Sequence, residues 1–430
     1  MSLVFLPIVL FVFFVLAYFI FYGRLVSPAS LVLSWWIFWY VVLLGSDIGF
    51  PSSSRHLHLV LTVFFLFFAL GSLWPPIICF TNVSELGLYS FNKKILYFVG
   101  FLGLPLLLFF YRKAQLVLSG DSFSGSRAVL IDYTQGSHPV FGSGFVRNSV
   151  DLLFAGPLFY LSLFAIPYLF TKQNVGFLAI SSLGIFLYQA TEFGRSQIYR
   201  QAIIFMIGIY LFKRHFKVHL RLRYWLLFAG VLLLVVAYMY YSAITRLKND
   251  PSASASDVVT EFISYHTVGY VLLDQALSDQ TSPLNDLIGW GRASLAGFLL
   301  AFTQIIRLFN SSYQPFLMEW LPYTEAFHDL GIKTASGKPF MFNAYYTMLF
   351  PFYLDFRLPG VAIISFSIGL GLHSFYESWL RYKSPLAFAW FVFLASFCMM
   401  SIFLSLTQKV YFFSALFLLL TAYARTNVRV

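Results

Sequence analysis

The feature that most constrains this chain is a series of apolar runs, each long enough to cross a lipid bilayer. A spanning helix needs about 20 apolar residues, because the hydrocarbon core is ~30 Å thick and a helix rises ~1.5 Å per residue. Eleven segments meet this description: 3–22, 30–46, 57–78, 95–111, 149–170, 175–193, 196–212, 224–243, 360–380, 385–404 and 409–424. Only 10% of the 430 residues are charged, too few to cover a soluble surface. The sequence therefore predicts an all-α polytopic integral membrane protein, with residues 1–430 forming a single membrane domain.

The distribution of basic residues predicts the orientation of these segments. Residues 213–223 carry five Lys and Arg in a short loop, and short basic loops stay on the cytoplasmic side. With that loop inside, the cytoplasmic side holds 13 basic residues against two acidic ones, Glu85 and Glu377, and accounts for the whole net charge of +11. The charge thus follows topology and does not indicate a nucleic-acid partner. We expect the N-terminus outside, the C-terminus inside, and segment 3–22 retained, because it has no basic n-region or cleavage site.

Two outer loops interrupt the spans in this topology. The smaller one, 112–148, is rich in Ser and Gly, and the larger one, 244–359, holds 10 of the 17 acidic residues. Within the larger loop, 293–309 is apolar, but a single span there would place the later basic residues outside. We therefore expect an interfacial or re-entrant helix, and the aromatic stretch Pro339–Pro359 is open to the same two interpretations. The large loop is predicted to form a cap pressed against the bilayer.

Several common catalytic signatures do not occur in the sequence. It has no P-loop, G-x-G-x-x-G, H-E-x-x-H or C-x-x-C motif, and no acidic pair typical of metal-dependent nucleotide-sugar sites. Cys79 and Cys398 lie far apart in apolar runs, which indicates neither a disulfide framework nor a thiolate metal site. We expect no metal and no cofactor.

Arginines at the outer ends of the spans are the strongest indication of chemistry. The sequence Gly-Arg-Ser at 194–196 opens segment 196–212, and the outward N-terminus of a helix favours an anion. We expect Ser196 to cap this helix and the guanidinium of Arg195 to bind phosphate oxygens. Arg200 lies about one turn deeper, where a charge is costly unless it faces a polar cavity. Further outer arginines are Arg246, Arg292, Arg307 and Arg357. Together they predict a diphosphate site, and the alternative is that they reach lipid headgroups or pair with loop carboxylates.

Candidate acid–base groups are fewer. The histidines on the outer side are His138, His266 and His328, and the carboxylates considered are Glu319, Glu325 and Asp355. A single histidine is more often structural than catalytic, and loop carboxylates usually face water, so the alternative for each is a structural or solvated side chain. Of these we retain His266, Glu319, His328 and Asp355 as catalytic candidates.

The chain resembles the Wzy-type oligosaccharide repeat-unit polymerases of O-antigen and capsule assembly. The resemblance rests on Gly-Arg-Ser at 194–196, on Arg246 after the next span, and on residues 343–360. Family members read there as Asn, aromatic residues, Tyr-x-Asp-Phe-Gly and a further Gly. In this sequence Arg357 replaces the first of those glycines.

This resemblance implies a GT-C-like helix bundle in the bacterial inner membrane that transfers a growing glycan from undecaprenyl diphosphate to a new lipid-linked repeat unit. It implies neither metal nor nucleotide, and it adds Asn343 and Tyr353 to the arginines as substrate-binding residues. The implied partners are undecaprenyl-diphosphate-linked oligosaccharides, membrane lipids, and a chain-length regulator and flippase of the same pathway.

Two alternatives remain open from the sequence. The related O-antigen ligases carry a His-Asn pair at the comparable point, whereas the residue before Asn343 is Phe342. A transporter or flippase should carry mid-span charges and repeat-related halves, and this sequence has few of the former and one large loop that breaks any symmetry.

Overall fold

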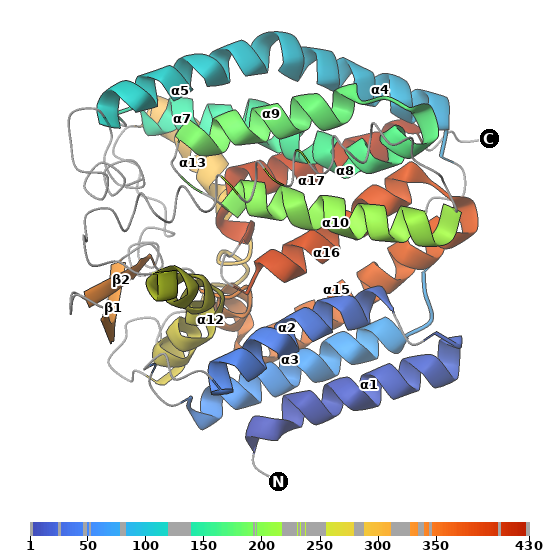
Figure 1. The fold of residues 1–430 in the computed structure, drawn as a ribbon, viewed down its shortest axis with the longest axis vertical. Helices are drawn as coiled ribbons and strands as arrows, with labels where there is room; N and C mark the ends of the chain where they lie inside the picture. The colour runs from blue at the N-terminus through green and yellow to red at the C-terminus, as the bar shows by residue number, and fades with distance from the viewer. Residues whose placement is uncertain are drawn as a thin grey trace.

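The computed structural model describes residues 3–24, 27–45, 50, 53–77, 83–118, 139–191, 194, 196–216, 230, 233, 237, 255–278, 288–310, 327–333, 339–343, 346–402 and 406–426. Over these ranges the chain is helical apart from turns and one two-stranded sheet (Figure 1). The helices are α1 (Leu6–Tyr22), α2 (Pro28–Gly45), α3 (Arg55–Leu73), α4 (Glu85–Phe98), α5 (Leu104–Leu118), α7 (Gly144–Val150), α8 (Gly156–Lys172), α9 (Gly176–Thr191), α10 (Ser196–Phe216), α12 (Ala255–Ser278), α13 (Ala296–Phe309), α15 (Leu349–Tyr382), α16 (Pro385–Met400) and α17 (Val410–Thr426). Strands β1 (Phe327–Lys333) and β2 (Pro339–Asn343) pair antiparallel.

The expected apolar segments coincide with helices wherever the structure describes them. Segment 224–243 lies almost wholly outside the described residues. Within the described ranges, four helical stretches are long and apolar enough to cross a membrane: Arg55–Leu73, Glu85–Val117, Gly144–Lys172 and Leu349–Tyr382. Shorter apolar helices accompany them, including α1, α9, α16 and α17. The architecture is that of an all-α membrane protein, and the full number of spans stays a prediction.

The core is built around α8 and α16. Every residue of α8 from Gly156 to Leu169 is buried, and so are nearly all those of α16. On the other side of the bundle α3 packs along α15 at close range, because glycines lie at the contact. A Cβ atom on Gly71 would collide with the Phe366 carbonyl, and one on Gly369 with the Phe68 carbonyl. Small residues at such positions let two membrane helices gain van der Waals contact along their backbones.

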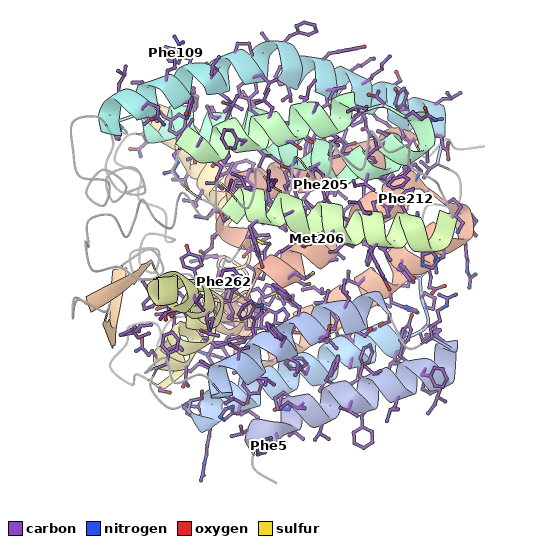
Figure 2. The ribbon with its side chains drawn as sticks, viewed as in Figure 1. Phe5, Phe109, Phe205, Met206, Phe212 and Phe262 are labelled. Carbon is purple, nitrogen blue, oxygen red and sulfur yellow. The ribbon has the colours of Figure 1, made fainter. Side chains whose placement is uncertain are left out.

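The outer surface of the bundle is apolar. Phe5, Phe109 and Met206 are each more than half exposed, whereas Phe205 and Phe212 on the same helix as Met206 are buried (Figure 2). Phe5 and Phe109 lie on opposite flanks of the bundle in this view. Soluble proteins rarely expose large contiguous apolar surface, so this surface fits a lipid environment.

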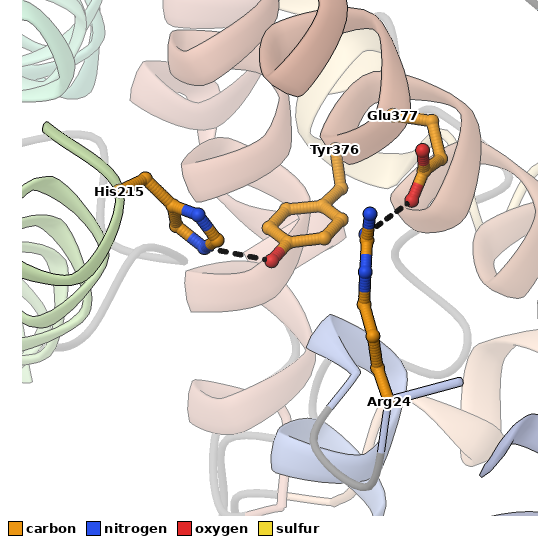
Figure 3. Close-up of polar contacts among 4 residues, drawn as sticks. All are labelled: Arg24, His215, Tyr376 and Glu377. Carbon is orange, nitrogen blue, oxygen red and sulfur yellow. Dashed lines mark hydrogen bonds and ion pairs between the residues drawn. The ribbon is translucent and has the colours of Figure 1, made fainter. Parts of the chain in front are cut away.

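The two ends of the bundle can be distinguished along α10. Arg200 lies near its start and His215 near its end, about 22 Å apart at ~1.5 Å per residue. At the second end the His215 Nε2 atom lies 3.0 Å from the Tyr376 hydroxyl, and Arg24 Nη1 donates to Glu377 Oε1 at 3.0 Å (Figure 3). We call these four residues the Arg24 end. The sequence places Arg24 and Glu377 on one side of the membrane, and the structure places them in contact.

The opposite end, which we call the Arg200 end, comprises the start of α10 and α17, the helix α13, and the start of α15. Helix α13 falls in the apolar stretch 293–309 and is about 21 Å long, too short to span the bilayer alone. It packs against α7, α17 and the turn Leu406–Gln408. The stretch Pro339–Pro359 is neither a span nor one interfacial helix, because β2 occupies its beginning and α15 starts at Leu349 with a kink at Phe356 and Arg357.

Candidate functional site

Arg200 is buried inside the bundle, with 2% of its surface exposed. Its guanidinium carbon lies 3.5 Å from the ring centroid of Phe159 on α8 and 4.9 Å from that of Tyr411 on α17. The Nη1 atom has no hydrogen-bond partner, and Arg200 forms no ion pair within the described part of the chain. Cation–π contacts recover some of the lost solvation, but a buried charge is strongly destabilising without a counter-ion. The site is therefore suited to an anion.

Two polar atoms next to Arg200 are also buried without a hydrogen-bond partner among the described residues. They are Gln197 Oε1, one turn away on α10, and Tyr411 Oη. The Tyr188 hydroxyl on α9 donates to Asp151 Oδ1 at 2.6 Å, and its ring lies 6.4 Å from that of Tyr411. We call Asp151, Tyr188, Gln197, Arg200 and Tyr411 the Arg200 cluster. Buried polar atoms are usually satisfied, so these side chains leave hydrogen-bonding capacity for a polar ligand beside Arg200.

The N-terminus of α10 differs from the sequence expectation. Gln189 Oε1, at the end of α9, accepts hydrogen bonds from the Gln197 backbone N–H at 2.7 Å and from the Ser196 hydroxyl at 3.4 Å. The prediction that Ser196 caps the helix is wrong, because Ser196 is already the first residue of the helix and its hydroxyl donates to the residue that caps it. One N–H group of the first turn is thus satisfied from within the protein, whereas Nη1 of the deeper Arg200 has no partner among the described residues.

A second polar feature joins the start of α15 to the turn before α13. Asp355 is fully buried, and its Oδ1 and Oδ2 atoms accept from the backbone N–H groups of Ala293 at 2.9 Å and Ser294 at 2.7 Å. The Gly289 N–H also donates to the Leu354 carbonyl at 3.0 Å. Both carboxylate oxygens are engaged, which favours a positioning role for Asp355 over acid–base chemistry. We call residues 288–295 and 353–358 the Asp355 junction.

The Asp355 junction carries two of the predicted arginines. Arg292 is exposed, and Arg357 is half-buried with its guanidinium carbon 5.4 Å from the ring centroid of Tyr353. Helix α13 connects the junction to the Arg200 cluster: Gly297 packs against the Lys409 backbone, and Phe298 lies 6.0 Å from Phe413. Lys409 and Phe413 flank Tyr411, so the junction and the cluster are neighbours at one end of the bundle.

His266 on α12 is held in a defined orientation. Its ring stacks on Trp39 with centroids 4.2 Å apart, and Nδ1 lies 2.8 Å from the Phe262 carbonyl, which can only accept. In the neutral ring Nδ1 therefore carries the proton, and Nε2 accepts from the Tyr199 hydroxyl at 3.1 Å. Tyr199 precedes Arg200, so His266 contacts α10 about 100° around the helix from Arg200.

The other predicted site residues fall outside the described part. Arg195, Arg246 and Glu319 are not among the described residues, nor are the side chains of Asn343 and His328. The backbone places both of these on the small sheet, where Asn343 pairs with Phe327 and His328 with Phe342.

Sequence reasoning missed the partners of Arg200. Asp151 carried a usable signal, because it lies within an expected span, where an acidic residue is a functional candidate. Gln197 also carried one, because its spacing of three residues from Arg200 places it on the same helix face. Tyr411 carried none, since its proximity to Arg200 arises from the packing of α8, α10 and α17.

Within the described ranges no group of three or more His, Cys, Asp or Glu residues is placed to hold a metal ion. Comparison of the chain with protein-family models, with curated proteins and with solved structures gave no match.

Proposed function

We propose that this protein is a metal-independent glycosyltransferase that polymerises undecaprenyl-diphosphate-linked oligosaccharide repeat units at the periplasmic face of the bacterial inner membrane. In this proposal the chain crosses the membrane eleven times, with the Arg200 end in the periplasmic leaflet and the C-terminus in the cytoplasm. A hydroxyl of the incoming repeat unit attacks the anomeric carbon of the growing glycan. The bond to the diphosphate breaks, and its electron pair leaves with undecaprenyl diphosphate.

The observation that carries this proposal is the buried, unpaired guanidinium of Arg200. The leaving diphosphate gains negative charge as the anomeric bond breaks, and a fixed cation in a poorly hydrated site stabilises that charge far better than water does. Gln197 and Tyr411 offer further polar atoms beside it. An anionic ligand would satisfy the Nη1 donor, which has no partner in the described part of the protein.

The arginines of the Asp355 junction support the same assignment. Arg292 is exposed and Arg357 is half-buried, whereas Arg200 is buried. A lipid-linked substrate could therefore meet exposed cations first and a buried one last. The proton of the attacking hydroxyl would pass to a carboxylate or to His266, which would first have to release the Tyr199 hydroxyl from Nε2.

The proposal is tested with purified full-length protein in lipid nanodiscs, supplied with lipid-linked repeat units as sole substrate. We expect the wild type to form a ladder of polymer, Arg200→Gln to lose it, and Arg24→Gln to keep it. Arg24 is the matched control, because it is an arginine paired with a carboxylate at the other end of the bundle. A wild type that forms no ladder from repeat units alone, but transfers glycan once a lipid A core is added, would be a ligase. A full ladder from Arg200→Gln would overturn the assigned role of Arg200.

A further inference from the structure

Backbone conformation singles out the Asp355 junction from the rest of the described chain. Among all the described residues, four non-glycine residues have positive φ: Gln173, Trp290, Arg357 and Lys383. Gln173 and Lys383 follow the last turns of α8 and α15 as left-handed C-caps, an ordinary way for a helix to end. Trp290 and Arg357 end no helix, and both belong to the junction.

The two junction residues adopt conformations that their side chains disfavour. Arg357 has φ 57° and ψ −147° inside the kink of α15, a region that glycine populates far more readily than other residues. Trp290 has φ 50° and is followed by Gly291 with φ 86°. Positive φ is uncommon for a bulky residue. Such strain persists only where surrounding contacts impose it, and it clusters at ligand sites.

Asp355 supplies those contacts. Its carboxylate holds the backbone N–H groups of residues 293 and 294, and the Gly289 N–H donates to the Leu354 carbonyl. A Cβ atom on Gly289 would collide with Asp355 Oδ1, so the segments can approach this closely only with glycine at 289. A buried carboxylate with both oxygens engaged thus fixes a strained turn against a strained kink.

These hydrogen bonds hold together two segments that present an exposed aromatic pair flanked by arginines. Trp290 is 69% exposed, and its ring meets that of Phe356, 42% exposed, edge to face at 6.1 Å and 82°. Arg292 and Arg357 lie beside these rings in sequence, one on each segment. Aromatic faces pack against the C–H faces of sugars, and guanidinium groups bind hydroxyl and phosphate oxygens.

We propose that Trp290, Arg292, Phe356 and Arg357, which we call the Trp290 platform, form a saccharide-binding subsite that takes the sugar residues next to the diphosphate of a lipid-linked glycan. This proposal rests on the proposed function and adds a recognition site for the sugars to the diphosphate site at Arg200. The platform belongs to the Asp355 junction, which α13 connects to the helix that carries Tyr411.

Trp74 shows why simple anchoring at the membrane interface does not account for Trp290. Trp74 is 57% exposed, and its ring meets Phe366 edge to face at 5.9 Å and 72°. It thus has a similar exposure and the same kind of ring partner. Its backbone, however, is relaxed, with φ −64° and ψ 146° after the end of α3. An interfacial tryptophan therefore needs no strained turn and no buried carboxylate to hold it.

The test is binding by full-length protein in nanodiscs, with two soluble probes: the repeat-unit oligosaccharide released from its lipid, and inorganic diphosphate. We expect Trp290→Ala to weaken oligosaccharide binding at least tenfold and to leave diphosphate binding unchanged. Trp290→Phe, which keeps a ring and guards against misfolding, should lose less than Trp290→Ala. Trp74→Ala should change neither affinity. Equal oligosaccharide affinity in wild type and Trp290→Ala, or no measurable oligosaccharide binding by the wild type, would overturn the platform.

Polymerisation assays separate failure of the platform from failure of the proposed function. If the platform is right, Trp290→Ala raises the KM for lipid-linked repeat units more than it lowers kcat. Normal KM in Trp290→Ala with normal polymer would refute the platform and leave the polymerase intact. Conversely, oligosaccharide binding that depends on Trp290 in a protein that forms no polymer would refute the polymerase and leave the platform standing.

Discussion

The arginines at the two ends of the bundle differ in burial and in pairing. At the Arg24 end the Arg24 side chain is 42% exposed, and its guanidinium donates to Glu377 at 3.0 Å. At the Arg200 end the guanidinium is buried between two aromatic rings, and its Nη1 atom has no partner in the described chain. An exposed ion pair contributes little to stability, whereas a buried unpaired charge carries a large desolvation cost. A folded protein retains such a charge where function requires it, which directs attention to the Arg200 end.

The contrast concerns charge and not hydrogen bonding alone. Orphan buried atoms also occur near the Arg24 end, where both ring nitrogens of His373 and the Tyr18 hydroxyl have no partner among the described residues. Neither side chain has to carry a charge, so water can satisfy both at modest cost. Arg200 is ionised under all ordinary conditions, and only an anion both pairs its charge and fills its donor.

The largest expected effect comes from replacing Arg200 with an apolar residue of similar length. We expect Arg200→Met to lower polymerisation by about 100- to 1000-fold, as removal of a group that stabilises a developing anion typically does. The same change should stabilise the protein by about 1–4 kcal/mol, because a well-packed apolar side chain avoids the desolvation cost of the charge. Polymer gels and thermal unfolding in nanodiscs measure the two effects. Arg24→Met should leave polymerisation unchanged, and a destabilised Arg200→Met protein would count against the unpaired state of Arg200.

The next largest effect is expected at Asp355. Asp355→Ala leaves the N–H groups of Ala293 and Ser294 unpaired, and each buried unsatisfied group costs about 1–3 kcal/mol. We expect a lower unfolding temperature and faster hydrogen exchange at residues 293 and 294. Asp355→Asn keeps one acceptor oxygen, so we expect a smaller fall in unfolding temperature and a smaller rise in the rate of hydrogen exchange. Slow exchange at these amides in Asp355→Ala would show that the carboxylate does not hold the turn.

A smaller effect separates two substitutions at Arg357. Because this residue occupies backbone conformations that suit glycine, Arg357→Gly should be more stable than Arg357→Ala by about 1 kcal/mol or more. Both variants lose the guanidinium equally, so the difference isolates the backbone strain. Denaturation of the two proteins side by side measures it. If the alanine variant is the more stable of the two, the kink is not strained.

The smallest effect is expected at the Arg24 end. Glu377→Gln removes the ion pair with Arg24 and should cost at most about 1 kcal/mol, because one partner is substantially exposed. The loss should shrink as salt is added, since salt screens exposed charges. Unfolding at low and high ionic strength measures both effects. A loss of stability several times larger would show that the ion pair contributes far more to the Arg24 end than its exposure indicates.

The helices were predictable from sequence to the extent that their signal is local. Apolar runs placed α1, α9 and α17 within a few residues, and the kink of α15 falls close to Pro359, a residue that disrupts helices. Arg357 stands where the polymerases that the sequence resembles carry glycine, and the structure gives that position a backbone conformation that glycine favours.

The contacts of the candidate site were not predictable, because they join distant parts of the chain. Asp355 binds N–H groups 61 and 62 residues earlier, and no local pattern encodes that pairing. The cap on α10 comes from Gln189 through packing of α9, and local preference therefore pointed to Ser196 instead. Tyr411 meets Arg200 only because α17 packs beside α8 and α10.

Binding of undecaprenyl diphosphate tests the central claim most directly. Wild-type protein, Arg200→Met and Arg24→Met would be purified at full length, placed in nanodiscs, and titrated with this lipid. The account predicts that Arg200→Met binds it at least tenfold more weakly than the wild type, whereas Arg24→Met binds it equally well. Equal affinity in wild type and Arg200→Met would contradict the claim that the buried guanidinium holds a lipid diphosphate.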